Sequence, residues 1–344
     1  HMNQTHRNWT AVGMPGLSDY PIVDPRGLVT PLFDGWSLDS VILRSNGKTL
    51  VPSQTIEADQ KILFEDELAV VTKTEQGDVK LVSRTEVRGE NPAVCEISVT
   101  GTAESKAWLV LMLRPYNPEG VSFIENVNLL ADEPGWRVND KSDVRFDQAP
   151  LRYIFSNYAN GDVFGRISNP IQQDSILCST GMATAAAIFE LEPKKPRTIR
   201  VSVPLPVDPK SHSKRSSWKE SLEGHSRLKI PDEKFQFLYD VSLRVLILHS
   251  PDDVYPGPYT YRRFWFRDAA FILNTMLMVG MTARVEQVLD RFPSRQTALG
   301  YFLSQDGEWD SNGEALWSLH RFCELTGRPP KREWRRAIHH GARW

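Results

Sequence analysis

Residues 231–248 read PDEKFQFLYDVSLRVLIL, and they mark a change in the pattern of the chain. A Pro-Asp pair opens the stretch, which is a typical helix start. Apolar residues then recur at helical spacing and predict one stripe for burial, made of Leu238, Val241, Val245 and Leu248. We therefore expect a helical region to begin here and a different kind of structure to precede it.

The region before this stretch is a series of short runs rich in β-branched and apolar residues, separated by turn signals such as Asn46-Gly47. The runs that we expect to form strands are residues 40–43, 49–51, 62–64, 68–72, 79–87, 94–100, 108–113, 153–155, 182–191 and 198–203. No helical pattern intervenes between them. So many short strands predict an antiparallel β-sandwich.

The region after residue 230 has the periodicity of consecutive helices. Beyond the first helix, we expect helices over residues 268–279, 282–291 and 313–325, and from Glu333 onward, each ending near a Gly or Pro. The segment from about 206 to 229 is rich in Ser, Lys and His and reads as a linker. The expected domains are therefore 1–229, a β-sandwich with a C-terminal linker, and 230–344, a helical domain.

Composition excludes several classes of function. The chain has 344 residues, enough for about two domains, and a formal net charge of -2 that provides no general attraction to nucleic acid or to an anionic membrane. The longest apolar runs, such as residues 107–113, are too short to cross a bilayer. We expect neither nucleic acid nor a membrane as a partner.

Cysteine usage points to a reducing compartment. Cys95, Cys178 and Cys323 are far apart and odd in number, which favours buried free thiols over disulfides, and no signal peptide is visible. We infer a cytoplasmic location. No His or Cys spacing suits zinc, and no phosphate-binding loop is present, so we expect neither a metal centre nor a cofactor.

Two stretches carry most of the functional signal. Residues 261–270 read YRRFWFRDAA, and residues 306–317 read DGEWDSNGEALW. Each sets aromatic rings beside polar groups just before an amphipathic helix, which suits a pocket that stacks a sugar ring and binds its hydroxyls. A purely structural alternative remains open, in which the acid interacts with the helix dipole and the rings lie in the core.

The first stretch resembles a motif of the helical-barrel glycosidases. Residues 265–269, WFRDA, are similar to the aromatic-x-Arg-Asp motif of glycoside hydrolase family 15, the glucoamylases and their relatives. The resemblance implies a β-sandwich followed by an (α/α)6 barrel. It also implies that Arg267 and Asp268 hydrogen-bond the sugar at the non-reducing end and that Trp265 forms an apolar wall.

The second stretch resembles the polar turn that leads into a later inner helix of the same barrel. By this looser match Trp309, Asp310 and Asn312 join the substrate-binding group, although the match assigns no individual roles to them. The substrate implied by the resemblance is an oligosaccharide or another α-linked glucoside.

The implied activity is inverting hydrolysis of α-linked glucosides by two carboxyl groups. The family carries both groups on later helices, so the resemblance places them beyond this chain, and the catalytic residues are unknown. Glu308, Asp310 and Glu314 are the local candidates for a substitute acid. The alternative is a non-catalytic carbohydrate-binding or scaffolding protein.

The helical region is short for such a barrel. It offers about five helices where the family closes a ring of about twelve, and the last one runs into Trp344 with apolar side chains still recurring. We expect a truncated chain that is inactive alone, and a barrel whose remaining part lies on another chain or is missing.

Overall fold

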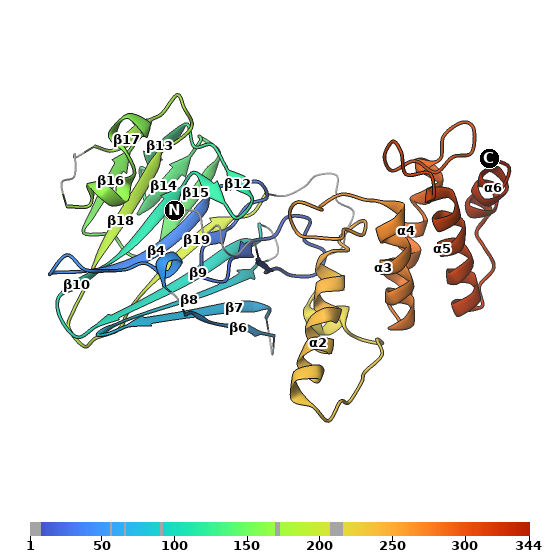
Figure 1. Cartoon of the computed structure of the whole chain (residues 1–344), viewed down its shortest axis with the longest axis horizontal. Helices are drawn as coiled ribbons and strands as arrows, with labels where there is room; N and C mark the ends of the chain where they lie inside the picture. Colours follow the sequence, from blue (N-terminus) through green and yellow to red (C-terminus); the bar gives the residue numbers. More distant parts are fainter. Residues whose placement is uncertain (1–7, 56, 65–66, 90–91, 169–172, 207–215) are drawn as a thin grey trace. The chain divides into compact units, whose positions relative to one another are not determined.

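The chain divides into two compact units in a computed structural model that describes residues 8–55, 57–64, 67–89, 92–168, 173–206 and 216–344 (Figure 1). One unit comprises His1–Met14 and Asp19–Asp208, and the other comprises Pro15–Ser18 and Pro209–Trp344. The first is built of strands and the second of helices. The domain boundary at residues 229 and 230 stays a prediction, and linker residues 207–215 lie outside the described part of the chain.

The first unit contains two large antiparallel sheets. The first sheet has the order β1-β2-β3-β4-β10-β18-β16, with β5 on β4, and the second has the order β17-β13-β14-β15-β19-β9-β8-β7-β6. The strands of the first sheet are β1 Thr10–Ala11, β2 Ile22–Val23, β3 Val29–Thr30, β4 Ser37–Arg44, β5 Thr49–Leu50, β10 Ala107–Arg114, β16 Arg152–Ser156 and β18 Thr184–Leu191. Those of the second are β6 Asp59–Leu63, β7 Ala69–Gln76, β8 Val79–Arg88, β9 Val94–Ala103, β13 Asn126–Leu129, β14 Gly135–Val138, β15 Ser142–Phe146, β17 Ser175–Leu177 and β19 Arg197–Pro204. A small hairpin pairs β11 Tyr116–Asn117 with β12 Gly120–Val121.

The two sheets pack face to face through aromatic side chains. The ring of Phe146 on β15 lies 5.8 Å from that of Phe189 on β18, and Trp136 on β14 lies 6.3 Å from Tyr153 on β16. Alternation along each strand brings one set of side chains to this interface and the other set to the outer face. Such edge-on ring contacts add to the burial of the rings themselves.

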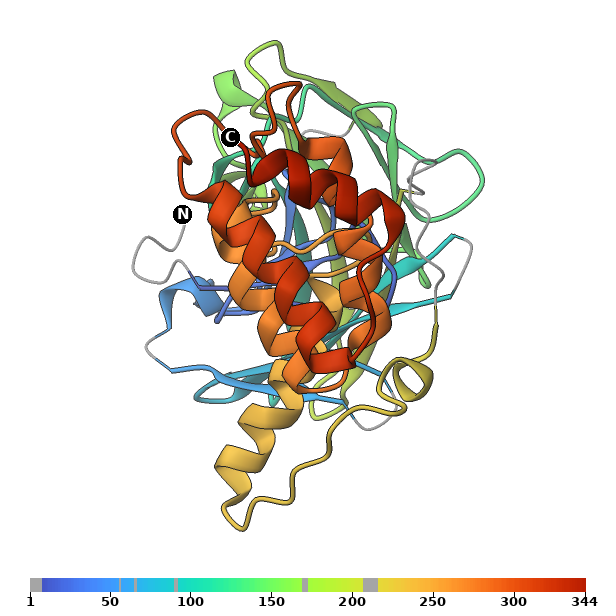
Figure 2. The same ribbon diagram turned by 90° about the vertical axis from the view of Figure 1, so that its right-hand side faces the viewer.

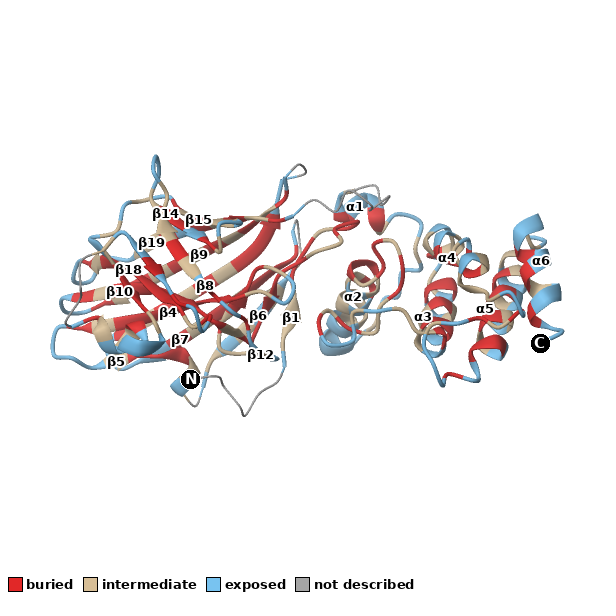
Figure 3. Cartoon of the chain, turned by 90° about the horizontal axis from the view of Figure 1, so that it is seen from above, coloured by how far each residue is buried: buried red, intermediate tan, exposed pale blue. Residues whose placement is uncertain are grey.

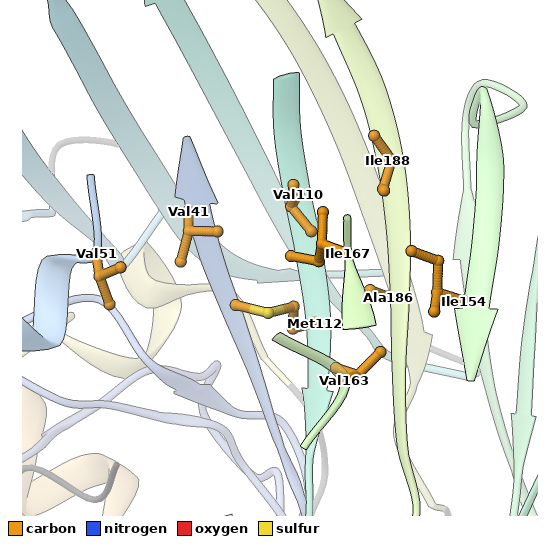
Figure 4. Close-up of a cluster of buried hydrophobic side chains, with 9 residues drawn as sticks. All are labelled: Val41, Val51, Val110, Met112, Ile154, Val163, Ile167, Ala186 and Ile188. Carbon is orange, nitrogen blue, oxygen red and sulfur yellow. The ribbon is translucent and has the colours of Figure 1, made fainter. Parts of the chain in front are cut away.

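The outer face of the first sheet is also apolar at its centre. Val41 on β4 and Met112 on β10 belong to a buried cluster that also includes Val51 and Val163 (Figure 4). Val51 immediately precedes the short helix η1, Pro52–Gln54, and Val163 begins the short helix η3, Val163–Arg166. One end of this face is polar instead of apolar, because the strands continue to Asp39 and Arg114 there.

The second unit is a series of helices. They are α1 Trp218–Ser221, α2 Glu233–Leu248, α3 Phe266–Met278, α4 Thr282–Leu289, η4 Phe292–Arg295, α5 Ser311–Thr326 and α6 Arg332–Gly341. Helices α3 and α5 lie side by side, and α4 also contacts both (Figures 1 and 2). Two large antiparallel sheets followed by helices confirm the predicted order of a β part and then an α part.

The predicted buried stripe of α2 is wrong in part. Leu248 is buried as predicted, but Leu238 and Val245 are exposed, and Leu243 and Ile247, which lie outside the stripe, are buried. Figure 3 colours α2 by burial and shows buried and exposed parts along it. The helix has apolar residues on most of its sides, so periodicity alone does not select the face that packs. Only the C-terminal turns of α2 are buried, which favours the face of Leu243 and Ile247 over the predicted one.

The sequence interpretation also missed α1 in the linker. Its N-terminus is a capping box, in which Ser217 and Glu220 each accept a hydrogen bond from the backbone of the other. Trp218, in its first turn, is buried. A Ser-x-x-Glu spacing was therefore the available signal within a segment that looked fully solvated.

Candidate functional site

The starts of α3 and α5 are joined by hydrogen bonds from the loop that precedes α5. The backbone N–H of Arg267 donates to Oε1 of Glu308 at 3.3 Å, and the N–H of Phe266 donates to Oγ of Ser304 at 3.4 Å. Ser304 also donates to Glu308, whose side chain is buried. The first N–H groups of a helix have no acceptor within the helix itself. Here the carboxylate of Glu308, from a distant part of the sequence, accepts from one of these N–H groups.

Arg267 and Asp310 form an ion pair across these two helix starts. Nη2 and Nε of Arg267 donate to Oδ2 of Asp310 at 2.6 and 3.1 Å, and both side chains are about half exposed. The Arg267 guanidinium lowers the pKa of Asp310 below its usual range. Because the pair is exposed, its contribution to stability is small, but it fixes where the guanidinium points. Nη1 takes no part in these bonds.

Glu314 lies one helical turn after Asp310 and is largely buried. Its Oε1 is 3.7 Å from Nε of Arg267, while its Oε2 is buried without a hydrogen-bond partner. Burial raises the pKa of Glu314 from 4.5 to about 7, and the negative charges of Asp310 and Glu308 add to this effect. A carboxyl group with such a pKa changes its protonation state near neutral pH.

Replacing Glu314 with Gln should alter how stability depends on pH. The pKa of Glu314 in the folded state, about 7, is above its ordinary 4.5. The stability that this group contributes is therefore complete below pH 4.5 and is lost as the pH rises through 7. Glu314→Gln removes that loss, so relative to the wild type the variant should gain on the order of 1 kcal/mol between pH 4.5 and pH 8. Urea unfolding of both proteins at the two pH values measures the difference, and an equal difference at both would contradict the raised pKa.

Asp268 lies in the first turn of α3 and is half-buried. Its carboxylate makes no hydrogen bond or ion pair within the described residues. An acid at this position interacts favourably with the helix dipole. The same position leaves its oxygens available to a ligand.

Aromatic rings flank this polar group. Nε1 of Trp265 donates to Oε1 of Gln305 at 2.7 Å, and Arg263 lies 4.4 Å above the Trp265 ring. Trp309 is 71 % exposed, and its ring stands 6.0 Å from that of Tyr301, which in turn is 4.7 Å from Trp344. Exposed indole rings of this kind can stack on the apolar face of a sugar.

Asn312 has a different environment from the other predicted residues. It is buried, its Oδ1 accepts from the N–H of Phe302 at 2.6 Å, and its Nδ2 donates to the carbonyl of Gly341 at 3.0 Å. Both ends of the amide thus connect segments of the second unit. The structure brings Arg267, Asp268, Trp309 and Asp310 to the two helix starts, while Asn312 holds the loop and α6 together.

Metal sites, membrane-spanning helices and disulfides are absent from the described residues. No group of three or more His, Cys, Asp or Glu side chains in the described ranges could hold a metal ion. None of the helices described is long and apolar enough to cross a membrane. Cys95 and Cys178 are buried free thiols, and Cys323 is a half-buried one.

Comparison with known proteins gives a match only in structure. No family model matches the sequence, and no curated protein does. A bacterial glucoamylase solved in complex with acarbose superposes with a TM-score of 0.62 at 10% identity, over 93% of this chain and 56% of that one. A 4-alpha-glucanotransferase from Thermococcus litoralis (TM-score 0.33, 7% identity, 59% of this chain and 40% of that one) and a putative kojibiose phosphorylase from the human microbiome (0.30, 9%, 93% and 35%) are far more distant.

The match with the glucoamylase concerns architecture. It covers the sheets and the helices of this chain together, and this chain spans about half the length of that protein. At 10% identity it does not carry residue roles. The chain therefore has a glucoamylase-like fold, with two antiparallel sheets followed by helices.

Proposed function

We propose that this chain is the N-terminal part of a glycoside hydrolase that acts on α-linked glucosides. In this proposal residues 1–229 form a β-sandwich domain and residues 230–344 the first helices of an (α/α)6 barrel. The likeness to a glucoamylase supports it, since this chain matches 56% of that protein, which was solved in complex with acarbose. Likeness of fold alone does not establish a function, so the argument rests on the residues.

The observation that carries the proposal is the polar group at the starts of α3 and α5. Asp310 fixes the guanidinium of Arg267 through Nε and Nη2, which leaves the N–H groups of Nη1 to donate to a sugar hydroxyl. Asp268, one residue later, has a carboxylate that can accept from a neighbouring hydroxyl. A donor and an acceptor on adjacent residues suit two adjacent hydroxyls of one sugar ring.

The rings at the site would complete the binding surface. Trp265 lies two residues before Arg267 and Trp309 directly before Asp310, and Trp309 is highly exposed. Sugar rings have an apolar face of C–H groups that packs on an indole. Asn312 is then a supporting residue, because it holds the loop that presents Trp309 and Asp310.

Hydrolysis needs two carboxyl groups on opposite sides of the scissile bond. In the proposed enzyme they belong to helices beyond this chain, and the reaction inverts the anomeric configuration. Glu314 is the local side chain that could hold a proton near neutral pH, but one of its oxygens is buried and the other faces Arg267. It therefore fits a role in tuning the charge of the site better than proton donation.

The alternative is a protein that binds carbohydrate without hydrolysing it. The neighbouring rings of Trp309, Tyr301 and Trp344, of which both indoles are exposed, would suit stacking on a sugar without any catalytic group. The enzyme and the binding protein differ in whether the bound sugar is cleaved.

The test combines binding with turnover. We expect the 344-residue protein to bind maltotriose and acarbose in calorimetric titrations, to ignore the β-linked control cellotriose, and to release no glucose. A protein extended by the helices that complete the barrel should release β-glucose from maltotriose. Binding without release by the extended protein would favour the alternative, and a folded chain that does not bind maltotriose would overturn both.

A further inference from the structure

A polar pocket lies in the first unit, beside the apolar cluster of Figure 4. It is on the outer face of the first sheet, between η1 and η3, and it encloses about 190 Å³. A single water needs about 10–15 Å³ of such space, so the pocket has room for a small organic molecule. Its walls include Asp39, Arg114, Tyr116, Asp162, Phe164 and Gly165.

The floor of the pocket is a buried arginine whose guanidinium is only partly hydrogen-bonded. The Arg114 side chain is only 7% exposed, and its Nη1 donates to both oxygens of Asp162 at 2.7 and 2.5 Å. Its Nε makes no hydrogen bond, since the nearest oxygen of Asp39 is 3.8 Å away, but it is fully enclosed, so a ligand in the pocket cannot reach it. Its Nη2 also makes no hydrogen bond within the described residues and is not fully enclosed, so this donor is available to a ligand atom in the pocket.

An acceptor, Asp39, lies beside the Arg114 side chain. The Asp39 side chain is 10% exposed, and its Oδ1 accepts from the N–H of Ser40 at 2.9 Å. Burial raises the pKa of Asp39, while the charge of Arg114 opposes the shift. The same two charges act on the phenol of Tyr116, whose pKa burial also raises.

The charges and rings of the pocket limit what it can bind. Among the described residues that line the pocket, Arg114 is the cation and Asp39 and Asp162 are the carboxylates. Arg114 already pairs with Asp162, and Asp39 is buried, so the lining offers no strong net charge to attract an anion or a cation. Phe164 and Tyr116 provide aromatic surface on the walls, and Phe164 also packs on the apolar cluster. An uncharged molecule with several hydroxyls and an apolar face satisfies both kinds of wall.

We propose that this pocket binds a neutral polyhydroxylated ring, such as a monosaccharide unit, with one hydroxyl accepting from Nη2 of Arg114 and another donating to Asp39. The pocket shares no residue with the group at the starts of α3 and α5. Its occupancy therefore does not depend on hydrolytic activity at that group.

A larger side chain at Gly165 should block the pocket without disturbing the fold. A Cβ added at Gly165 meets no atom within 4 Å, and the backbone there does not need glycine, so Gly165→Leu should fold normally and fill the space. Gly120, on β12 of the same unit, has the same freedom and does not line the pocket, which makes Gly120→Leu the matched control. Phe164→Leu removes the aromatic face while keeping an apolar contact with the cluster.

The experiment maps amide shifts of the full chain by NMR. Methyl α-glucoside, methyl β-galactoside and myo-inositol serve as neutral probes, added at about 10 mM to detect millimolar binding, and inorganic phosphate and guanidinium serve as charged ones. We expect at least one neutral probe to shift the amides of Gly165 and Tyr116 in the wild type and in Gly120→Leu. The affinity should fall at least about tenfold in Gly165→Leu and also fall in Phe164→Leu.

Three results would overturn the proposal. The first is that no neutral probe shifts the pocket amides, in which case the pocket holds water only. The second is that phosphate or guanidinium shifts them and the neutral probes do not. The third is an affinity unchanged in both Gly165→Leu and Phe164→Leu. A sugar bound only at α3 and α5 would give shifts near Asp268 and none at Gly165, so failure here leaves the proposed function standing.

Discussion

Asp268→Ala should lower kcat/KM for maltotriose on the order of a hundredfold in the complete enzyme, or about 3 kcal/mol of transition-state stabilisation. The reason is that a half-buried carboxylate with no partner in the described structure is the acceptor proposed for a sugar hydroxyl, and alanine removes it. The helix should survive, because the lost interaction with the helix dipole is worth less than about 1 kcal/mol.

Steady-state kinetics on maltotriose measures the effect, with Asp306→Ala as the control. Asp306 is an exposed acid in the loop before α5 and makes no hydrogen bond or ion pair in the described structure. That variant should keep wild-type kcat/KM. Unchanged turnover in Asp268→Ala would remove Asp268 from the site and favour the purely structural reading of the motif.

Phe266→Ala should destabilise the second unit by about 3–5 kcal/mol. Phe266 is 1% exposed, and its ring makes edge-on contacts with Phe264, Phe292 and Phe302 at centroid distances of 5.0, 5.0 and 5.6 Å. Removing the ring leaves a cavity that three other rings surround. Denaturant unfolding of the full chain, followed by tryptophan fluorescence, measures the loss.

Phe271 on the same helix is the matched control, because it is 68% exposed. Phe271→Ala should change stability by less than about 0.5 kcal/mol. A loss below about 1 kcal/mol for Phe266→Ala would mean that the cluster relaxes around the gap and that packing does not fix the start of α3.

The strands that the sequence predicted are those with strong apolar patterns. The expected run at 79–87 lies within β8, where buried side chains alternate over most of the strand, and the run at 108–113 lies within β10, which is buried on both faces over most of its length. The strands β13, β14 and β15 were missed because their short runs carry Asn, Arg and Asp. The sequence did contain a turn signal between β14 and β15, the pair Asn139-Asp140. Both residues adopt positive φ, as a two-residue hairpin turn requires, and Asn and Asp tolerate that conformation better than most residues.

The candidate site was predictable only in part. Local sequence drew attention to Arg267, Asp268 and Asp310, since charged residues beside aromatic ones are conspicuous. It did not show that Arg267 pairs with Asp310, because that contact joins two helix starts 43 residues apart. Nor could it separate Asn312, which supports the backbone, from its exposed neighbour Asp310, because a side chain's partners depend on tertiary packing.

Glu308 ties the loop before α5 to the first turn of α3, and this has a consequence for the thermodynamics of binding. The loop that carries Trp309 and Asp310 is ordered when the chain folds, so its conformational entropy is lost then and not when a ligand arrives. Affinity should accordingly depend on how firmly the two helix starts are held. Loosening Glu308 would weaken binding through entropy, with every group that contacts the sugar still in place.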